Sequence, residues 1–383
     1  MSFLGYRRPN GAVGVRNHIG IISTTVCATD LALWISQRVQ GTAPFLHSQG
    51  CCQTKPDLEI VTRTLISLGC NPNLAGVLVV GLGCESIVAD EVVAGIAKSG
   101  KPVEKILAQK LGGITGALAE GVRIAQDMVL NASKIIKEEC PDSELVIGVK
   151  CGASDTTSGL VSNPAAGATF DLLLDKGGTC VFGETTEFMG AEHILARRAA
   201  TPEIAQRIIK SVATIEQRVN AMGCDMRGGQ PAGGNIRGGL STIEEKSLGA
   251  IVKSGTKTID GFYEYGERVE GKGLFIVDSP GREPEILTAL AAAGVQVILF
   301  STGLGAPQGF PFVPIIKLTG NPNTYQSLSD YIDFFVDMGN STIAQAGQEL
   351  YQEVLSVASG KQTKAEIINY GCFPNILTVG PII

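Results

Sequence analysis

The chain of 383 residues is long enough for about two packed domains. Its formal net charge of -6, without a long basic run, offers no attraction to nucleic acid or to an anionic membrane surface, so we exclude both as partners. The N-terminal segment lacks the apolar core of a signal peptide, and apolar runs elsewhere end at about eight residues. We therefore expect a cytoplasmic protein whose ten cysteines are thiols or metal ligands rather than disulfides.

Short β-rich runs alternate with longer helical stretches, which is typical of helices packed around a mainly parallel sheet. The predicted strands are 18–24, 76–82, 103–108, 145–149, 178–182, 273–277, 295–300 and 313–318. The predicted helices have apolar residues at three- and four-residue steps and cover 57–68, 87–98, 115–139, 202–222, 283–293 and 342–359. The pattern predicts an α/β fold of two Rossmann-like layers, each a mainly parallel sheet flanked by helices.

The main predicted boundary falls within the segment EECPDSE, near Cys140–Ser143, where a long charged helix ends before a new apolar strand. It divides the chain into a first α/β domain, 1–141, and a second, 142–383. Within the second domain, residues 223–239 are too rich in glycine to be regular and too long for a simple turn. We interpret that stretch as a functional loop or a hinge.

Four predicted strands end in glycine-containing loops, VVGLGCES, GVKCGASDTTSG, VFGETTE and FSTGLGAPQG, and the first three also contain cysteine or acidic residues. In open parallel sheets, ligands bind at the carboxyl ends of strands, so these loops predict a site. Nucleotide-binding glycine patterns fail in their details, and no GxSxG elbow accompanies the three histidines.

Histidine and glutamate side chains stand out in two of the segments. His47 ends a strand-like run and is followed by SQGCCQ, which favours a metal ligand or a base over a core histidine. Glu184 and Glu187 directly follow a predicted strand, in a segment that also contains His193. The plainer alternative for that segment is a solvated, capped helix.

Cysteines 27, 51, 84 and 151 each follow a strand and precede small or acidic residues. Three such thiols with an imidazole suit iron(II) or zinc, whereas carboxylates with an imidazole suit iron(II), manganese or magnesium. A cluster held by three cysteines is a further alternative. Lys246, beside flexible glycines, is a candidate base or carboxylate clamp, although a plain helical lysine fits the spacing equally well.

Seven landmarks together resemble the altronate/galactarate dehydratase family and its relative, the large subunit of sulfolactate sulfo-lyase. They are GYRRPNGAVGVRNHIGI, HSQGC, GLGCE, KCGASDTTSGLVSNPAAG, GETTEFMGAEH, GNIRGGLSTIEEKSLGAIVKSG and YEY, and they cover nearly the whole chain. His47, Cys51 and GLGCE resemble the sugar-acid branch, while KCGASDTT is more similar to the sulfo-lyase branch.

The resemblance implies the large catalytic subunit of a sugar-acid dehydratase of the altronate type, a carbon–oxygen lyase that forms a 2-keto-3-deoxy acid. It also implies a separate small SAF-domain subunit, an α-hydroxy carboxylate substrate and an oligomeric assembly. The alternatives are a sulfolactate sulfo-lyase large subunit, a carbon–sulfur lyase, and a non-catalytic or iron–sulfur subunit.

Dehydration of such an acid requires proton removal beside a carboxylate, and a divalent metal, Fe(II) or Mn(II), stabilises the developing charge. An iron–sulfur cluster stays open as the alternative cofactor. As a hypothesis, the metal ligands are Cys51, Cys84, Cys151 and Glu187. The catalytic candidates are His47, His193, Lys246 and Glu184, and the substrate-binding candidates are Arg16, Asn17, Asp155, Ser158, Asn163 and Asn235.

Overall fold

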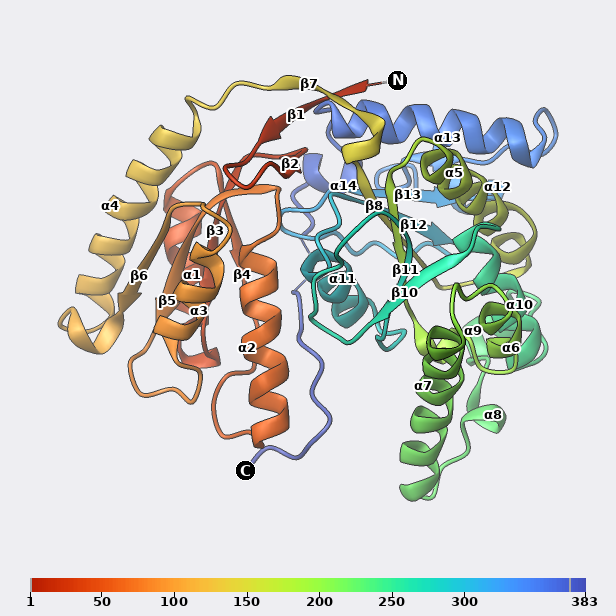
Figure 1. The fold of residues 1–383 in the computed structure, drawn as a ribbon, viewed down its shortest axis with the longest axis horizontal. Helices are drawn as coiled ribbons and strands as arrows, with labels where there is room; N and C mark the ends of the chain where they lie inside the picture. Colours follow the sequence, from red (N-terminus) through yellow and green to blue (C-terminus); the bar gives the residue numbers. More distant parts are fainter. Residues whose placement is uncertain (1, 372) are drawn as a thin grey trace.

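Two parallel β-sheets form the frame of the computed structural model, which describes residues 2–371 and 373–383 (Figure 1). The first sheet has the order β4-β3-β5-β6, with β3 (His18–Ser23), β4 (Thr42–Phe45), β5 (Leu74–Gly81) and β6 (Val103–Leu107). The second has the order β10-β11-β9-β8-β12-β13-β14, with β8 (Val146–Gly152), β9 (Thr179–Phe182), β10 (Ile259–Tyr263), β11 (Gly273–Val277), β12 (Val297–Thr302), β13 (Ile315–Thr319) and β14 (Phe334–Phe335). The predicted α/β fold of parallel sheets flanked by helices is confirmed.

Helices of the first part are α1 (Thr29–Arg38), α2 (Lys55–Gly69), α3 (Ala89–Ala97) and α4 (Ile114–Ala132). The longer helices of the second part are α5 (Asn163–Asp175), α7 (Pro202–Ala221), α10 (Ile243–Ile251), α11 (Glu283–Ala292) and α13 (Ile343–Ala358). Shorter ones are α6 (Glu192–Ala196), α8 (Met226–Gly229), α9 (Gly233–Arg237), α12 (Pro322–Ser327) and α14 (Lys364–Ile367). Proline in the first turn begins α2, α5, α7 and α11, because its fixed φ suits that position and its missing N–H is not needed there.

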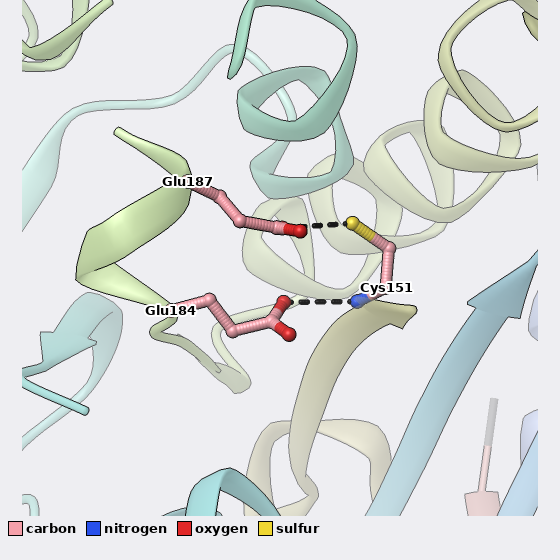
Figure 2. A group of neighbouring side chains, drawn as sticks. All are labelled: Cys151, Glu184 and Glu187. Carbon is pink, nitrogen blue, oxygen red and sulfur yellow. Dashed lines mark hydrogen bonds between the residues drawn. The ribbon is translucent and has the colours of Figure 1, made fainter. Parts of the chain in front are cut away.

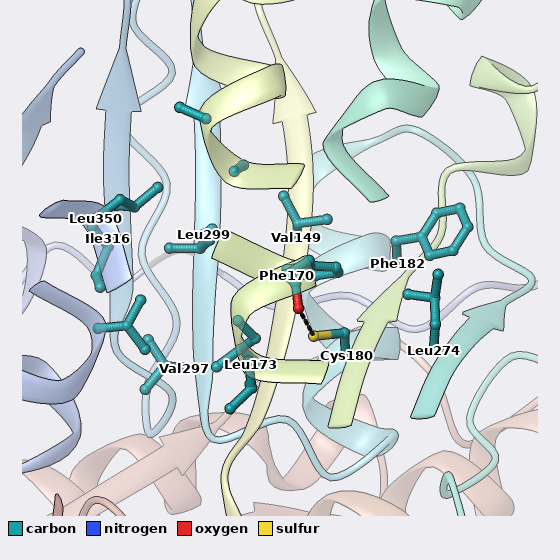
Figure 3. Packing of buried hydrophobic residues seen from close by; sticks show 14 of the residues in the cluster. Val149, Phe170, Leu173, Cys180, Phe182, Leu274, Val297, Leu299, Ile316 and Leu350 are labelled. Atoms are coloured by element: carbon teal, nitrogen blue, oxygen red, sulfur yellow. Dashed lines mark hydrogen bonds between the residues drawn. The ribbon is translucent and has the colours of Figure 1, made fainter. Parts of the chain in front are cut away.

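The helices and sheets pack in layers around three apolar cores. The outer face of the first sheet is covered by α1 and α4, and the inner layer, containing α2, α3 and α11, lies between the two sheets. Helices α5 and α13 cover the far face of the second sheet. Figure 3 shows this last core, where Phe170 and Leu173 of α5 pack over Val149 and Leu299 of the sheet.

Two sequence expectations are wrong in detail. The predicted helix 115–139 ends at Ala132, because Glu138–Pro141 forms strand β7 and pairs antiparallel with β1 (Ser2–Arg7). Strand β1 also pairs with β2 (Val13–Gly14), giving a small third sheet. The glycine-rich stretch 223–239 is not wholly irregular, since α8 and α9 lie within it.

The carboxyl ends of the strands carry the loops that contain the cysteine and glutamate candidates, as expected for parallel sheets, whereas Arg16 and Asn17 precede β3. The C-terminal segment crosses from the second part back to the first, where Ile382 pairs with Gln53 in a single antiparallel bridge. In the described part of the chain, no helix combines the length and apolar character needed to cross a membrane.

Candidate functional site

A buried cluster of charged and sulfur-containing side chains lies at the carboxyl ends of β8 and β9 (Figure 2). The Glu184 carboxylate accepts a hydrogen bond from the backbone N–H of Cys151 at 2.9 Å, and the Cys151 thiol donates to Glu187 at 3.0 Å. The Nζ of Lys253 donates to Cys151 Sγ at 3.1 Å, Glu184 Oε2 at 2.7 Å and Glu187 Oε2 at 2.8 Å. All three ammonium hydrogens of Lys253 are thus used within this cluster, which we call the Lys253 cluster.

Local backbone structure brings these residues together. Cys151 is the next-to-last residue of β8, and Glu184 follows β9 in the left-handed region at φ +67°. Glu187 ends the 3-10 turn Thr185–Glu187. Lys253 lies in the 3-10 turn Val252–Ser254, which directly follows α10. The end of β8, the left-handed residue Glu184 and the turn that follows α10 therefore bring these side chains into contact.

Burial and neighbouring charges act in opposite directions on these groups. Burial raises the pKa of the Glu184 carboxyl, and the charge of Glu187 adds to that rise. Burial would also raise the pKa of Glu187, but the ammonium groups of Lys253 and Lys246 outweigh it and lower that pKa to about 2. Burial, with the charge of Glu187, raises the pKa of the Cys151 thiol to about 12. The two carboxyls of one cluster therefore differ in acidity, as in sites that separate acid and base roles.

Two further lysines border the Lys253 cluster. Lys150 is fully buried, with Nζ 3.3 Å from Glu184 Oε1, 3.4 Å from Glu283 Oε1 and 4.3 Å from the centroid of the Phe300 ring. Lys246 is partly exposed, with Nζ 3.9 Å from Glu187 Oε1 and 3.2 Å from Gln230 Oε1. Lys150 compensates the negative charge of Glu184 in the protein interior, whereas Lys246 lies between Glu187 and the protein surface.

Cys151, Glu184 and Glu187 offer a donor set for a metal ion, because one ligand atom from each lies within 4.8 Å of the others. Thiolate and carboxylate ligands suit divalent transition metals. Metal–ligand bonds of about 2.0–2.3 Å place an ion in the space that the Lys253 ammonium fills, so metal binding requires that side chain to withdraw. The residues fit a metal in type and spacing, in competition with Lys253.

A cavity of about 320 Å³ adjoins the cluster on the side of Lys246, which lines it. Asp155, Ser158 and Asn163 line the same cavity, so four of the residues singled out from the sequence come together here. Asn163 donates from Nδ2 to Gly249 O at 2.7 Å, while its buried Oδ1 has no hydrogen-bond partner in the described chain.

Asp155 and Ser158 are tied to each other and to the protein. One carboxylate oxygen of Asp155 accepts from the Ser158 backbone N–H at 3.0 Å, and the other accepts from Asn321 at 2.8 Å. Asn235 donates to Ser154 O at 2.9 Å and accepts from the Ala232 N–H at 3.2 Å. These side chains therefore shape the loop around the cavity.

The two histidines of the sequence hypothesis lie outside the Lys253 cluster. His47 is buried, with Nε2 2.7 Å from Ser23 O and Nδ1 accepting from the Gln49 N–H at 3.1 Å, so backbone groups occupy both ring nitrogens. His193, on α6, is exposed to solvent. The structure gives His47 a packing role and leaves His193 away from the cluster.

The cysteines expected to share one metal site are divided between the two sheets. Cys151 is in the Lys253 cluster, whereas Cys51 and Cys84 lie in loops at the carboxyl edge of the first sheet. Cys51 Sγ lies 3.7 Å from Cys52 Sγ, and Gln109 Nε2 donates to Cys84 Sγ at 3.3 Å. The ligand set Cys51, Cys84, Cys151 and Glu187 is therefore not assembled, because its members end strands of different sheets.

Arg16 and Asn17 precede β3 and therefore lie at the amino end of that strand, where they bond to distant parts of the chain. Arg16 pairs with Glu366 at 2.6 Å and donates to two backbone carbonyls of the C-terminal region, Val357 O and Lys361 O. Asn17 accepts from Arg8 at 2.8 Å and donates to Ala132 O at 2.8 Å. Neither side chain is placed to bind a substrate at the Lys253 cluster.

The sequence analysis missed Lys150 and Lys253, the two buried lysines of the site. Each had a signal in the sequence. Lys150 directly follows the apolar predicted strand 145–149 and can extend it, and Lys253 lies two residues before Gly255 in the segment IVKSG. A lysine inside an apolar strand has to be paired when buried, so Lys150 predicts an acidic partner nearby.

Two family models match successive parts of the chain. Residues 142–376 match the family model described as D-galactarate/altronate dehydratase, C-terminal, and residues 5–133 match that of the D-galactarate dehydratase/altronate hydrolase second domain. The chain is 39% identical to the (2R)-sulfolactate sulfo-lyase subunit beta of Chromohalobacter salexigens, over 96% of this chain and 95% of that one.

Two dehydratases are also similar. The altronate dehydratase of Bacillus subtilis is 36% identical over 87% of this chain and 68% of its own length. The galactarate dehydratase (L-threo-forming) of Escherichia coli is 33% identical over 94% of this chain and 73% of its own length. The chain therefore belongs to the D-galactarate/altronate dehydratase family and is a lyase.

Proposed function

We propose that the chain is the catalytic subunit of a sugar-acid dehydratase of the altronate type, which removes water from a 2,3-dihydroxy carboxylate. The enol formed first converts to a 2-keto-3-deoxy acid. One observation carries the assignment of the site: Lys246 lines the 320 Å³ cavity and lies 3.9 Å from Glu187 of the buried cluster. A basic group at a cavity wall, backed by a buried carboxylate, suits proton removal beside a substrate carboxylate.

In this proposal Lys246 is the base. As a neutral amine it takes the proton from the substrate carbon next to the carboxylate, and Glu187 stabilises the ammonium ion that results. Glu187 stays ionised in this step through the Lys253 ammonium, which is the larger of the two cationic causes of its lowered pKa and does not depend on the charge of Lys246. The raised pKa of Glu184 makes it the better proton donor to the departing hydroxide.

The cavity residues orient the substrate. The free Oδ1 of Asn163 accepts a hydrogen bond from a substrate hydroxyl, which satisfies an otherwise unpaired buried oxygen. Asp155 and Ser158 hold the loop that forms the cavity wall, since their polar atoms already bond to each other. Their role is therefore to position the loop.

A divalent metal, Fe(II) or Mn(II), is proposed as the cofactor, which Cys151 and Glu187 of the donor set would hold, leaving Glu184 as the proton donor. When bound, it supplies Lewis-acid stabilisation of the negative charge that develops on the substrate carboxylate. The cluster contains a single cysteine, whereas an iron–sulfur centre is usually held by four, so a mononuclear metal is favoured.

Carbon–sulfur cleavage of sulfolactate is the second candidate. It uses the same proton removal, with sulfite rather than hydroxide leaving the adjacent carbon. The observation that favours it is the 39% identity to a sulfo-lyase subunit, against 36% and 33% to the dehydratases. That relative is named as a subunit beta, which supports a partner subunit for this chain as well. We propose a small SAF-domain subunit as that partner, in an oligomeric complex.

The test is to purify the chain with and without a small SAF-domain subunit, add Fe(II) or Mn(II), and supply altronate, galactarate or sulfolactate. Keto-acid formation from a sugar acid supports the first candidate, and sulfite release from sulfolactate supports the second. Lys246→Met should lower kcat roughly 10²- to 10⁴-fold, whereas Lys257→Met, which removes an exposed ammonium group, should not. Product from none of the three substrates, or full activity of Lys246→Met, contradicts the proposal.

A further inference from the structure

A second cavity, of about 430 Å³, lies between α7 and the carboxyl ends of β9, β10 and β11. It shares no lining residue with the cavity beside Lys246. The turn Thr185–Glu187 separates the two sites: Thr186 lines the second cavity, while Glu187 belongs to the Lys253 cluster. The proposed function makes no use of this cavity.

Three basic side chains from one face of α7 line its wall, beside apolar residues. Arg207, Lys210 and Arg218 all line the cavity, at spacings that place them along one side of a helix. Arg207 is already engaged, because it pairs with Glu264 at 2.6 Å and lies 5.0 Å from the centroid of the Phe262 ring. Lys210 and Arg218 make no side-chain hydrogen bond or ion pair with any described residue.

The acidic groups of the cavity leave a positive excess. Glu264 is neutralised by Arg207. Asp278 accepts a hydrogen bond from Thr185 Oγ1 at 2.6 Å, and burial raises the pKa of its carboxyl. Two free cations therefore face one hydrogen-bonded carboxylate. A polar floor of Thr186 and Ser279 lies beside them, at the sheet edge where parallel sheets bind ligands.

We infer that this second cavity binds a small oxyanion, either a tetrahedral one of the phosphate or sulfonate type or a carboxylate. The guanidinium of Arg218 offers a planar pair of donors, Lys210 offers a point charge, and Thr186 offers a hydroxyl. An anion bound there lies on the other side of the turn Thr185–Glu187 from the Lys253 cluster. The inference concerns binding alone and stands independently of the reaction that the chain catalyses.

The experiment is isothermal titration of the purified chain with inorganic phosphate and, separately, with lactate, at low ionic strength. Saturable binding is expected, weakened roughly two- to fivefold by Arg218→Gln or Lys210→Gln and further in the double variant. Lys98→Gln removes an exposed ammonium group at the end of α3 and should leave binding unchanged. Tighter phosphate binding identifies a tetrahedral oxyanion as the ligand, and tighter lactate binding identifies a carboxylate.

The cavity beside Lys246 is the competing location. Lys246→Gln should leave anion binding intact, because Lys246 does not line the second cavity. Binding that is lost in Lys246→Gln and unchanged in the Lys210/Arg218 double variant overturns the inference, as does the absence of saturable binding for both anions. Arg218 and Lys210 are exposed, so unchanged circular dichroism and melting temperature are expected to show that the variants fold.

Discussion

Lys253 contributes to balancing the buried acidic groups, together with Lys150 and Lys246, and its ammonium group contacts Cys151, Glu184 and Glu187. Lys253→Met removes that cation and leaves buried carboxylate charge less compensated. Breaking a buried ion pair from one side typically costs about 3–5 kcal/mol, and we expect a loss of that order in the free energy of unfolding. Urea denaturation followed by circular dichroism measures it.

Lys257→Met is the matched control for Lys253→Met. Lys257 also pairs with a carboxylate, that of Asp175, but this pair lies at the surface, with 37% of the Lys257 and 63% of the Asp175 side chain exposed. Solvent screens such a pair, so no measurable change in stability is expected. Equal effects of the two substitutions would contradict the view that the Lys253 ammonium balances buried charge.

His47 should make stability depend on pH between about 4 and 6.5. Burial lowers the pKa of His47 from 6.5 to about 4. Below pH 6.5 the unfolded chain therefore takes up a proton that the folded chain does not, and stability present above that pH is lost as the pH falls to about 4. The free energy of unfolding should fall by up to ~3 kcal/mol across this window, at 1.36 kcal/mol per unit.

Denaturation of His47→Gln at several pH values checks this prediction. The slope of stability against pH should become shallower in that variant, but part of it should remain, because the pKa of the half-buried His18 is also lowered. His193→Gln should keep the full slope, because His193 is exposed. A slope that is unchanged in His47→Gln would mean that His47 is not the titrating group.

Among individual residues, the sequence predicted part of the Lys253 cluster. Glu184, Glu187 and Cys151 were found because each follows a predicted strand in a parallel sheet. The prediction that Cys51 and Cys84 share one site with Cys151 was wrong. A strand end in the sequence shows that a residue lies at a sheet edge, but it does not show which of the two sheets the strand joins. Lys253 was missed because only the tertiary path of α10 brings it to the cluster.

Among the secondary-structure elements, the turn that carries Lys253 is held by a close approach to α5. A Cβ added at Gly167 would lie 2.3 Å from Val252 O, the backbone of that turn. Gly167→Ala should therefore push the turn away from Glu184 and Glu187 and cost about 1–3 kcal/mol in stability, with loss of activity. Thermal unfolding and a lyase assay measure both effects.

Gly229→Ala is the control for Gly167→Ala. Gly229 lies in the helix α8 with open space around its Cα, so an added methyl group meets nothing within 4 Å. Alanine in a helix is about 0.5–1 kcal/mol more favourable than glycine, so this variant should be as stable as the parent or slightly more so. A tolerated Gly167→Ala would show that α5 does not fix the position of Lys253.

The elements that the sequence predicted best are those set by local signals. Helix α11 begins at Glu283, as predicted, with Pro284 in its first turn, and strand β11 matches its predicted range. Helix α4 was predicted too long, since residues beyond Ala132 continue a helical pattern. Strand β1 lies more than a hundred residues earlier in the chain, and its pairing with β7 is a tertiary contact that no local pattern encodes.

Across the whole molecule, the C-terminal segment ties the two sheets together. Asn375 donates to Glu285 at 2.9 Å, in the first turn of α11, and accepts from Gln49 at 3.4 Å, in the loop after β4. Further on, the backbone of the segment bonds to α2 of the first part. The segment therefore couples the carboxyl edges of both sheets, although the division near residue 141 stays a prediction.

Asp57 holds the end of this segment, because its carboxylate accepts from the backbone N–H of Val379 at 2.7 Å and of Gly380 at 2.9 Å. Asp57→Ala removes both hydrogen bonds. Hydrogen bonds to charged groups are worth about 1.5–3 kcal/mol, so hydrogen exchange of the peptide 375–383 should accelerate roughly tenfold or more. Glu59→Ala, at an exposed position of the same helix, should leave that exchange rate unchanged. Equal protection of the segment in both variants would show that its own packing, rather than Asp57, fastens it across the two sheets.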